Sequence, residues 1–237
     1  MLSDEELVPW LDIACAILLE IAIIIVKKVP FKIRKHPEPD LSLAAPRRFK
    51  VIRRQFAMFY FFAVLPILLI GAIRISKTRQ FHMVNVLVGY FISQFLTALT
   101  VDLMKLFLSR PRPDTHTLCG GQSSVEACAA TLNVEQLRNQ FRSHPSGGTA
   151  EMVAVGVFCT LTLHDLWPNR SFVSFLMKFA PMFWAFFSGA ARIVGHAHHP
   201  EDVASSMVIG GTIGYLAWKM ILRRRKSDYV RLPSIDE

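Results

Sequence analysis

Residues 83–108 read MVNVLVGYFISQFLTALTVDLMKLFL, an apolar run that carries charge only at Asp102 and Lys105, near its end. A bilayer core needs about 20 mainly apolar residues in one helix, so this run is long enough to cross it. Five further stretches approach that length, at 8–26, 56–73, 149–167, 172–190 and 203–222. The pattern predicts an all-α integral membrane protein with six transmembrane helices.

The composition of the whole chain is typical of a protein embedded in a membrane. Of its 237 residues, 52% are hydrophobic and only 19% are charged, whereas soluble domains carry about 25% charged residues. This argues against an ordinary cytosolic enzyme and excludes a disordered chain. The formal net charge of +9 fits basic loops beside anionic headgroups or a site for an anionic substrate, and we expect no nucleic-acid partner.

We expect a single six-span membrane domain over residues 1–237, with its core at about 8–222 and a short basic tail at 223–237. An even number of spans puts both termini on one side of the membrane. The positive charges do not decide which side that is, because the 27–55 loop holds ten basic residues and the terminal side holds another ten. With six spans, the ends of the third and fifth spans and the starts of the fourth and sixth spans lie at the same face of the membrane.

Three groups of polar residues lie at span ends on that face. The first is 105–112, KLFLSRPR, whose terminal Lys and Arg are about two helical turns apart. The second is 143–148, SHPSGG, which offers hydroxyls and free backbone N–H groups to an anion at the start of a helix. The third is 192–202, RIVGHAHHPED, in which Asp202 is placed to orient the ring of His198 for attack.

Cations, donor amides and a carboxylate-backed histidine together suit phosphoryl transfer. Arg binds phosphate through two parallel hydrogen bonds, and Lys adds a point charge. A histidine can take the phosphoryl group while these cations hold the charge that develops on its oxygens. A transporter is disfavoured, because the charged groups gather at one membrane face and not at the midplane.

These residues resemble the three signature motifs of the type 2 phosphatidic acid phosphatase superfamily, the lipid phosphate phosphatases. The motifs are Lys105…Arg112-Pro113, Pro145-Ser146-Gly147 and Arg192…His198…Asp202, at the family's spacings and in its order. The resemblance implies that His198 is the nucleophile that forms a phosphohistidine and that Asp202 raises its nucleophilicity. It implies a phosphate site made of Lys105, Arg112, Ser146, Gly147 and Arg192.

The resemblance also implies a substrate and a place in the cell. We expect hydrolysis of phosphomonoesters such as phosphatidate or lysophosphatidate, with no cofactor and no metal, because fixed cations replace it. Membrane lipids are further expected partners, and assembly into a homo-oligomer stays open. The family's site is extracellular or lumenal and its termini are cytosolic, in the plasma membrane or endoplasmic reticulum, although the basic 27–55 loop conflicts with that orientation. On an oxidising side, Cys119 and Cys128 are a candidate disulfide.

Position 148 departs from the family. Its second motif ends in the His that protonates the leaving alkoxide, and here Gly148 takes that place. General acid catalysis contributes about 10²–10⁴-fold, so turnover should suffer. Three interpretations stay open: an introduced inactivating change, a natural pseudophosphatase that binds lipid phosphates or partner proteins, or an enzyme that uses another acid. We expect His144 to be a loop residue and not that acid, and Glu151 to face the bundle or the membrane interface.

Overall fold

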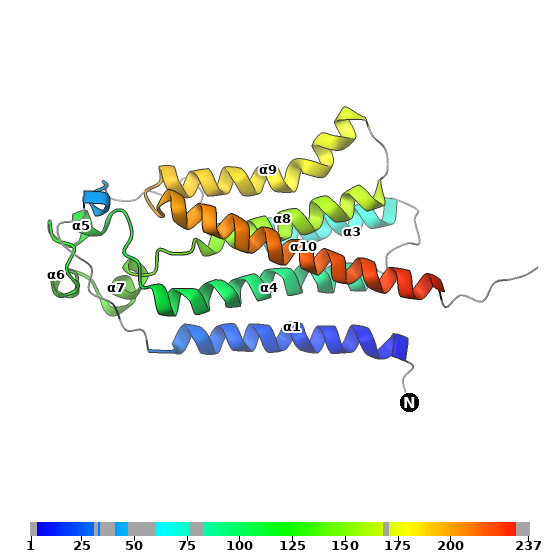
Figure 1. Cartoon of the computed structure of the whole chain (residues 1–237), viewed down its shortest axis with the longest axis horizontal. Coiled ribbons are helices and arrows are strands. Elements are labelled where there is room, and N and C mark those ends of the chain that lie inside the picture. The colour runs from blue at the N-terminus through cyan, green and yellow to red at the C-terminus, as the bar shows by residue number, and fades with distance from the viewer. Residues whose placement is uncertain are drawn as a thin grey trace, which may run out of the picture.

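Long helices run side by side along the longest axis of the molecule, and three short helices gather at one end of them (Figure 1). The structure is a computed structural model that describes residues 4–30, 33, 41–46, 60–75, 83–167 and 171–230. No strand occurs among these residues. Most of the basic 27–55 loop, the first residues of the expected second span and the last part of the expected tail, 231–237, lie outside them.

Helices occupy all six positions at which spans are expected. They are α1 (Asp4–Lys28), the π-helix η2 (Tyr60–Val64) continuing as α3 (Leu65–Ile75), α4 (Met83–Leu108), α8 (Gly147–Leu166), α9 (Phe172–Val194) and α10 (Pro200–Val230). Of the described helices, three are long and apolar enough to cross a membrane by length and composition, namely α4, α8 and α9, and α3 is a shorter apolar helix. The prediction of an all-helical integral membrane protein is confirmed, and the count of six spans stays a prediction.

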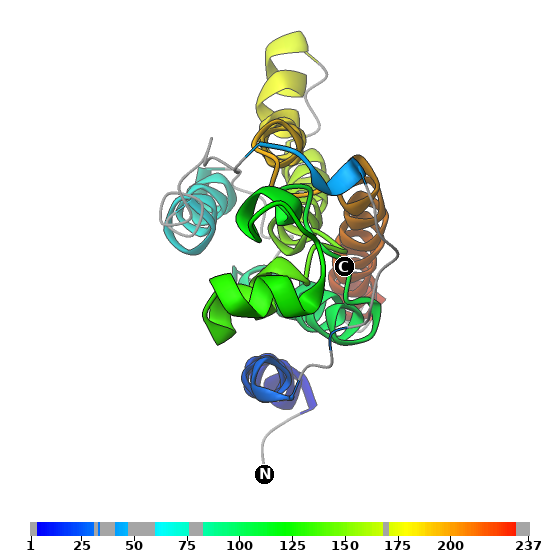
Figure 2. The same cartoon turned by 90° about the vertical axis from the view of Figure 1, so that its left-hand side faces the viewer.

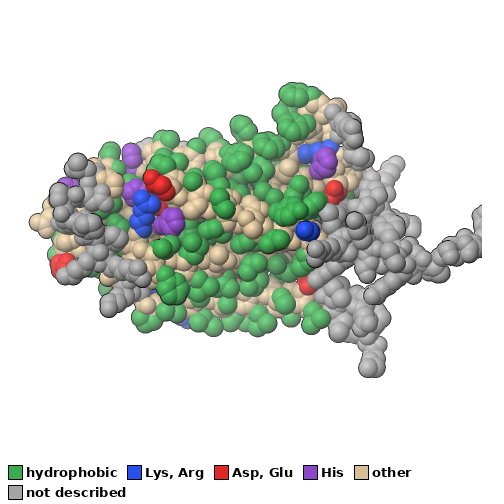
Figure 3. All heavy atoms as spheres, viewed as in Figure 1, with side chains coloured by type: hydrophobic (Ala, Val, Ile, Leu, Met, Phe, Trp, Pro, Cys, Tyr) green, Lys and Arg blue, Asp and Glu red, His purple; other side chains and the backbone are tan. Residues whose placement is uncertain are grey.

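The outer surface of the bundle is apolar between its two ends. Figure 3 shows hydrophobic side chains over the middle of the molecule and charged and histidine side chains toward both ends. Leu18, Ile67, Phe183 and Val208 are each more than half exposed, although they come from four different helices. Contiguous exposed apolar surface of this kind is rare on soluble proteins and suits contact with lipid.

Helix α8 is the central helix and packs against α4, α9 and α10. Its fully buried Phe158 meets the ring of Tyr90 from α4 edge to face, with the ring centroids 6.4 Å apart. Gly210 and Gly214 set the contact between α10 and α8, because a Cβ added to either would lie 2.2 Å from a backbone oxygen of α8. Only glycine permits so close an approach, and the approach places the first half of α8 against the middle of α10.

The remaining long helices flank this centre. Helix α1 packs along α4, and the view along the bundle places α1 and α9 on opposite sides (Figure 2). Helix α9 contains Pro181, and its first half bends away from the bundle (Figure 1). Proline removes one backbone hydrogen bond and clashes with the preceding turn, which explains a bend at this point.

The short helices α5 (Thr115–Leu118), α6 (Val125–Thr131) and α7 (Val134–Gln140) form a cap over one end of the bundle. Side chains of Ser124 and Asn133 accept from backbone N–H groups at the starts of α6 and α7 and fix where these helices begin. The segment with the 3₁₀-helix η1 (Leu41–Leu43) joins the cap, because the Ala45 N–H donates to the Pro113 carbonyl at 3.0 Å. The first and last described residues lie at the opposite end (Figure 1).

Candidate functional site

His198 lies in the turn between α9 and α10, and its side chain is almost fully buried. Its Nδ1 atom is 2.8 Å from the backbone carbonyl oxygen of Ser143. A carbonyl oxygen can only accept, so Nδ1 carries the proton and donates it. The lone pair therefore lies on Nε2, the ring nitrogen that can attack a phosphorus atom.

The surroundings of His198 keep its ring neutral. Burial, followed by the charge of Arg112, lowers the pKa of His198 to about 3. The adjacent His199 also has a lowered pKa, through burial and the charge of Arg110. A neutral imidazole retains the lone pair that nucleophilic attack requires.

Asp202, in the first turn of α10, is fully buried and is surrounded by donors. Its carboxylate accepts from Nη1 of Arg110 at 2.9 Å, the Ser143 hydroxyl at 2.5 Å, Nδ1 of His144 at 3.0 Å and the His199 N–H at 3.0 Å. The distance from Oδ2 of Asp202 to Nδ1 of His198 is 3.7 Å, which is longer than a hydrogen bond. The structure thus differs from the sequence-based expectation: the Ser143 carbonyl orients the His198 ring, and Asp202 holds Ser143 in place.

Arg112 links the cap to His198. Its backbone N–H donates to the Gln140 carbonyl at 3.0 Å, and its side chain donates to the carbonyl oxygens of Asn139 at 2.9 Å and Ala197 at 2.5 Å. The same Nη1 atom lies 3.4 Å from Nε2 of His198. The guanidinium is therefore positioned beside the nitrogen that would attack.

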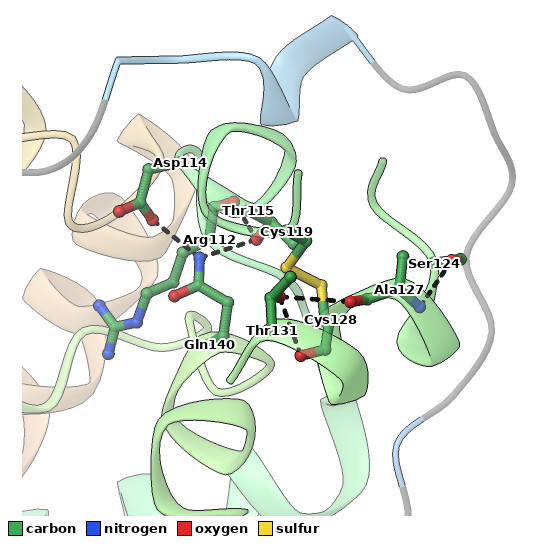
Figure 4. The surroundings of a disulfide bond; sticks show 9 residues. All are labelled: Arg112, Asp114, Thr115, Cys119, Ser124, Ala127, Cys128, Thr131 and Gln140. Atoms are coloured by element: carbon green, nitrogen blue, oxygen red, sulfur yellow. Dashed lines mark hydrogen bonds between the residues drawn. A yellow bond between two sulfur atoms is a disulfide. The ribbon is translucent and has the colours of Figure 1, made fainter. Parts of the chain in front are cut away.

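A disulfide joins Cys119 and Cys128 inside the cap, with their Cα atoms 4.5 Å apart. Figure 4 shows it near Gln140, whose side-chain amide donates to Asp114 at 2.8 Å and to Thr115 at 2.9 Å. Gln140 is fully buried, so these contacts attach the end of α7 to the start of α5. They support the segment that carries Arg112.

Lys105 lies in the last turn of α4 and approaches the start of α8. Its Nζ atom would be 3.0 Å from a Cβ added to Gly147. Asp102 precedes Lys105 by three positions on the same helix, a spacing that allows an ion pair, but Asp102 forms ion pairs with Arg142 at 3.2 Å and with Lys27 at 3.9 Å. Within the described residues no hydrogen bond or ion pair engages the Lys105 ammonium, which leaves it able to meet a phosphate.

The start of α8 supplies backbone donors. Ser146 precedes the first residue of the helix, Gly147, and both are buried. The Ser146 hydroxyl exchanges a hydrogen bond with that of Thr149 at 2.9 Å, and the Ser146 N–H donates to the Asp202 carbonyl at 3.2 Å. The second and third motifs are thus joined through their backbones, and the first N–H groups of α8 have no partner inside the helix.

Arg192, in the last turn of α9, reaches over Gly148. A Cβ added to Gly148 would lie 3.0 Å from Nη2 of Arg192. The space beside Gly148 is therefore next to the Arg192 guanidinium. Lys105, Arg112 and Arg192 are all brought to the same end of the bundle as His198.

Sequence reasoning missed two contributors to this arrangement and underrated a third. Arg110 donates to Asp202 and also lies 3.4 Å from a Glu201 oxygen, while Ser143 contacts both His198 and Asp202. Both residues lie inside segments quoted from the sequence, 105–112 and 143–148, but residue type and spacing alone did not assign them these partners. His144 is a loop residue as expected, but its ring is bonded to Asp202. Within the described residues, no group of three His, Cys, Asp or Glu side chains could hold a metal ion.

Curated proteins of similar sequence are lipid phosphatases by name. The "Probable diacylglycerol pyrophosphate phosphatase 1" of Schizosaccharomyces pombe is 27% identical over 147 residues, covering 57% of this chain and 53% of that protein. Lipid phosphate phosphatase 1 of Arabidopsis thaliana is 22% identical over 165 residues, covering 66% and 50%. Diacylglycerol pyrophosphate phosphatase 1 of Saccharomyces cerevisiae is 27% identical over 208 residues, covering 78% and 68%. The aligned part thus spans about half the length of the first two relatives.

No solved structure matches the chain. The sequence model of the PAP2 superfamily matches residues 82–226, which is more than half of the chain. The matched segment begins just before α4, ends within α10 and contains all three motifs. The chain therefore belongs to the PAP2 superfamily.

Proposed function

We propose that this chain is a metal-independent lipid phosphate phosphatase that works through a phosphohistidine at His198. Phosphatidate and lysophosphatidate are the first candidate substrates. Diacylglycerol pyrophosphate is a further candidate, because two of the similar proteins carry it in their names. The observation that carries the proposal is the hydrogen bond from Nδ1 of His198 to the Ser143 carbonyl, since it leaves the Nε2 lone pair beside a cation.

Each further motif residue has a task in the proposed reaction. Lys105, Arg112 and Arg192 hold the phosphate oxygens, with the hydroxyl of Ser146 and the N–H of Gly147. As Nε2 of His198 attacks, the phosphoryl oxygens gain charge that fixed cations and amides stabilise without reorganisation. Water then attacks the phosphohistidine and releases phosphate. Asp202 acts by keeping Ser143 and the turn at His199 in position.

The placement in the membrane is part of the proposal. We propose six spans, a lumenal or extracellular site in the plasma membrane or endoplasmic reticulum, and cytosolic termini. In support, the cap and the motif residues lie at one end and the described chain ends lie at the other (Figure 1). Protease digestion of sealed vesicles should remove a C-terminal tag only when that tag faces outward. Residues 169–171 read NRS, a glycosylation sequon between the fourth and fifth expected spans, and a glycan at Asn169 would contradict this orientation.

A pseudophosphatase is the second candidate, and Gly148 favours it. Glycine cannot donate a proton, and Arg192 lies against it. Such a protein would still bind lipid phosphates through the same cations. It would differ from an enzyme only in failing to release phosphate.

Phosphate release from phosphatidate in mixed micelles separates the two candidates. We expect the purified chain to release phosphate in the presence of a metal chelator, and His198→Ala to abolish release. His116→Asn, a histidine of the cap outside the site, is the matched control and should keep the activity. Binding of orthovanadate without any release would favour the pseudophosphatase, and loss of release in the chelator would contradict metal independence.

A further inference from the structure

Glu151 is a carboxylic acid that points toward the phosphate-binding residues from inside a membrane helix. It lies one turn beyond Gly147 in α8, and residues four apart share a helix face. Its Oε1 atom would be 3.8 Å from a Cβ added to Gly147, and Nζ of Lys105 would be 3.0 Å from the same point. The two groups therefore flank Gly147 together.

Four charged groups act on Glu151, namely Lys105, Asp102, Lys27 and Arg192. Two of them, Lys105 and Arg192, are proposed phosphate-binding residues. Asp102 is already paired with Arg142 and Lys27, and within the described residues no hydrogen bond or ion pair engages the Glu151 carboxyl. An ionisable group inside a membrane helix is costly and marks function by default.

Two other groups near the site are poorly suited to protonate a leaving alkoxide. His144 is hydrogen-bonded to Asp202, on the carboxylate that supports the nucleophile, whereas the leaving oxygen lies opposite the attacking atom in an in-line displacement. Arg192 lies over the position of the missing acid, but a guanidinium does not give up its proton in proteins. Glu151 differs from both residues, because a carboxylic acid can give up its proton and, within the described residues, its side chain makes no hydrogen bond to Asp202.

We propose that Glu151 is the proton donor of this site and takes the part of the histidine that is absent at position 148. The proposal rests on the proposed function. As Nε2 of His198 bonds to phosphorus, the bond from phosphorus to the ester oxygen breaks, and that oxygen takes the carboxyl proton of Glu151. The alcohol leaves, and the Glu151 carboxylate remains beside the Lys105 ammonium.

The second half of the cycle restores the acid. A water molecule attacks phosphorus and gives one proton to the Glu151 carboxylate, the phosphorus–nitrogen bond breaks, and inorganic phosphate departs. His198 regains its neutral ring and Glu151 its proton. No oxidant, reductant or metal ion takes part in either step.

Glu151→Gln tests the proposal, because glutamine keeps the shape of glutamate and cannot act as an acid. Phosphatidate has a poor alkoxide leaving group and needs protonation, whereas p-nitrophenyl phosphate does not. We expect Glu151→Gln to lower kcat/KM for phosphatidate by about 10²-fold or more and kcat/KM for p-nitrophenyl phosphate by less than about tenfold, because kcat/KM reports the steps up to departure of the leaving group and excludes the later attack of water. Glu135→Gln, an exposed carboxyl at the start of α7, is the matched control.

The possible results separate this proposal from the proposed function. An equal loss of kcat/KM for both substrates in Glu151→Gln means a structural role for Glu151 and overturns the inference alone. Unchanged phosphatidate turnover in Glu151→Gln also overturns it. If the unmodified chain releases phosphate from neither substrate while binding orthovanadate, the phosphatase function fails, and the inference fails with it.

Discussion

Arg192 lies directly over Gly148, so that the first carbon of any side chain at position 148 would sit 3.0 Å from the guanidinium. The proposed phosphate-binding residue Arg192 and the residue that stands in place of the family's acid are therefore in contact. A side chain added at position 148 would shift the Arg192 guanidinium first.

This contact makes Gly148→Ala informative. The added methyl group must push the guanidinium aside, and we expect orthovanadate to bind about tenfold more weakly. Arg192→Ala should weaken binding about tenfold or more, because charge-assisted hydrogen bonds contribute about 1.5–3 kcal/mol each. The double variant should bind no more weakly than Arg192→Ala, since groups in contact do not act additively. Additive losses would show that Gly148 acts without Arg192.

The glycines of α10 allow a second prediction, about the packing that joins the motifs. Gly210→Ala and Gly214→Ala should each lower stability by about 1–3 kcal/mol, because overpacking forces the helices apart. Gly211→Ala is the control on the same helix, since its Cβ would be 4.0 Å from the nearest side chain. Thermal unfolding in detergent should give Gly211→Ala a higher melting temperature than Gly210→Ala or Gly214→Ala. Equal melting temperatures would contradict the close contact of α10 and α8.

Motif spacing and parity were enough to predict which residues gather at one end of the bundle. Lys105, Arg112 and His198 come together as expected because each lies at a span end that an even topology puts on one face. The partner of His198 could not be predicted in the same way. It is a backbone carbonyl, which every residue possesses, and its position depends on how the segment before α8 folds.

Local backbone geometry is a second feature of the site that could not be predicted from the sequence. Ser109 adopts a positive φ of 50°, which ends α4 and directs the following Arg110 toward Asp202. The stretch from Pro111 to Gly147 reads as a polar loop, but it contains the three short helices of the cap. Their signal was present in the capping residues, such as Asn133 with Gln136 three positions later, although short helices depend on tertiary contacts that sequence does not display.

The neutral ring of His198 predicts a pH dependence of stability. Its pKa falls from an ordinary 6.5 to about 3 through burial and the charge of Arg112. Below about pH 6.5 the unfolded chain binds a proton that the folded chain refuses, so His198 should reduce stability progressively as the pH falls toward about 3. The melting temperature should therefore drop more steeply between about pH 7 and pH 4 for the unmodified chain than for His198→Gln. If the melting temperatures of the unmodified chain and of His198→Gln fell equally with pH, the result would contradict a neutral buried ring.

The cap disulfide predicts an effect of reduction. Opening the link between Cys119 and Cys128, nine positions apart, should cost about 2–3 kcal/mol in the loop-entropy account. Because Arg112 is attached to the cap, the double variant Cys119→Ser/Cys128→Ser should show a higher KM for phosphatidate. Steady-state kinetics with and without a reductant measure this, and an unchanged KM in both tests would show that the cap does not support Arg112.

The central claim is that phosphate passes through Nε2 of His198. The most direct measurement is rapid acid-free quenching of the purified chain during turnover of ³²P-labelled phosphatidate, followed by mass spectrometry of the labelled peptide. We predict an acid-labile phosphoryl group on His198 that is absent in His198→Ala and accumulates when the attack of water is slow. A label on another residue, or phosphatidate hydrolysis that persists in His198→Ala, would contradict the account.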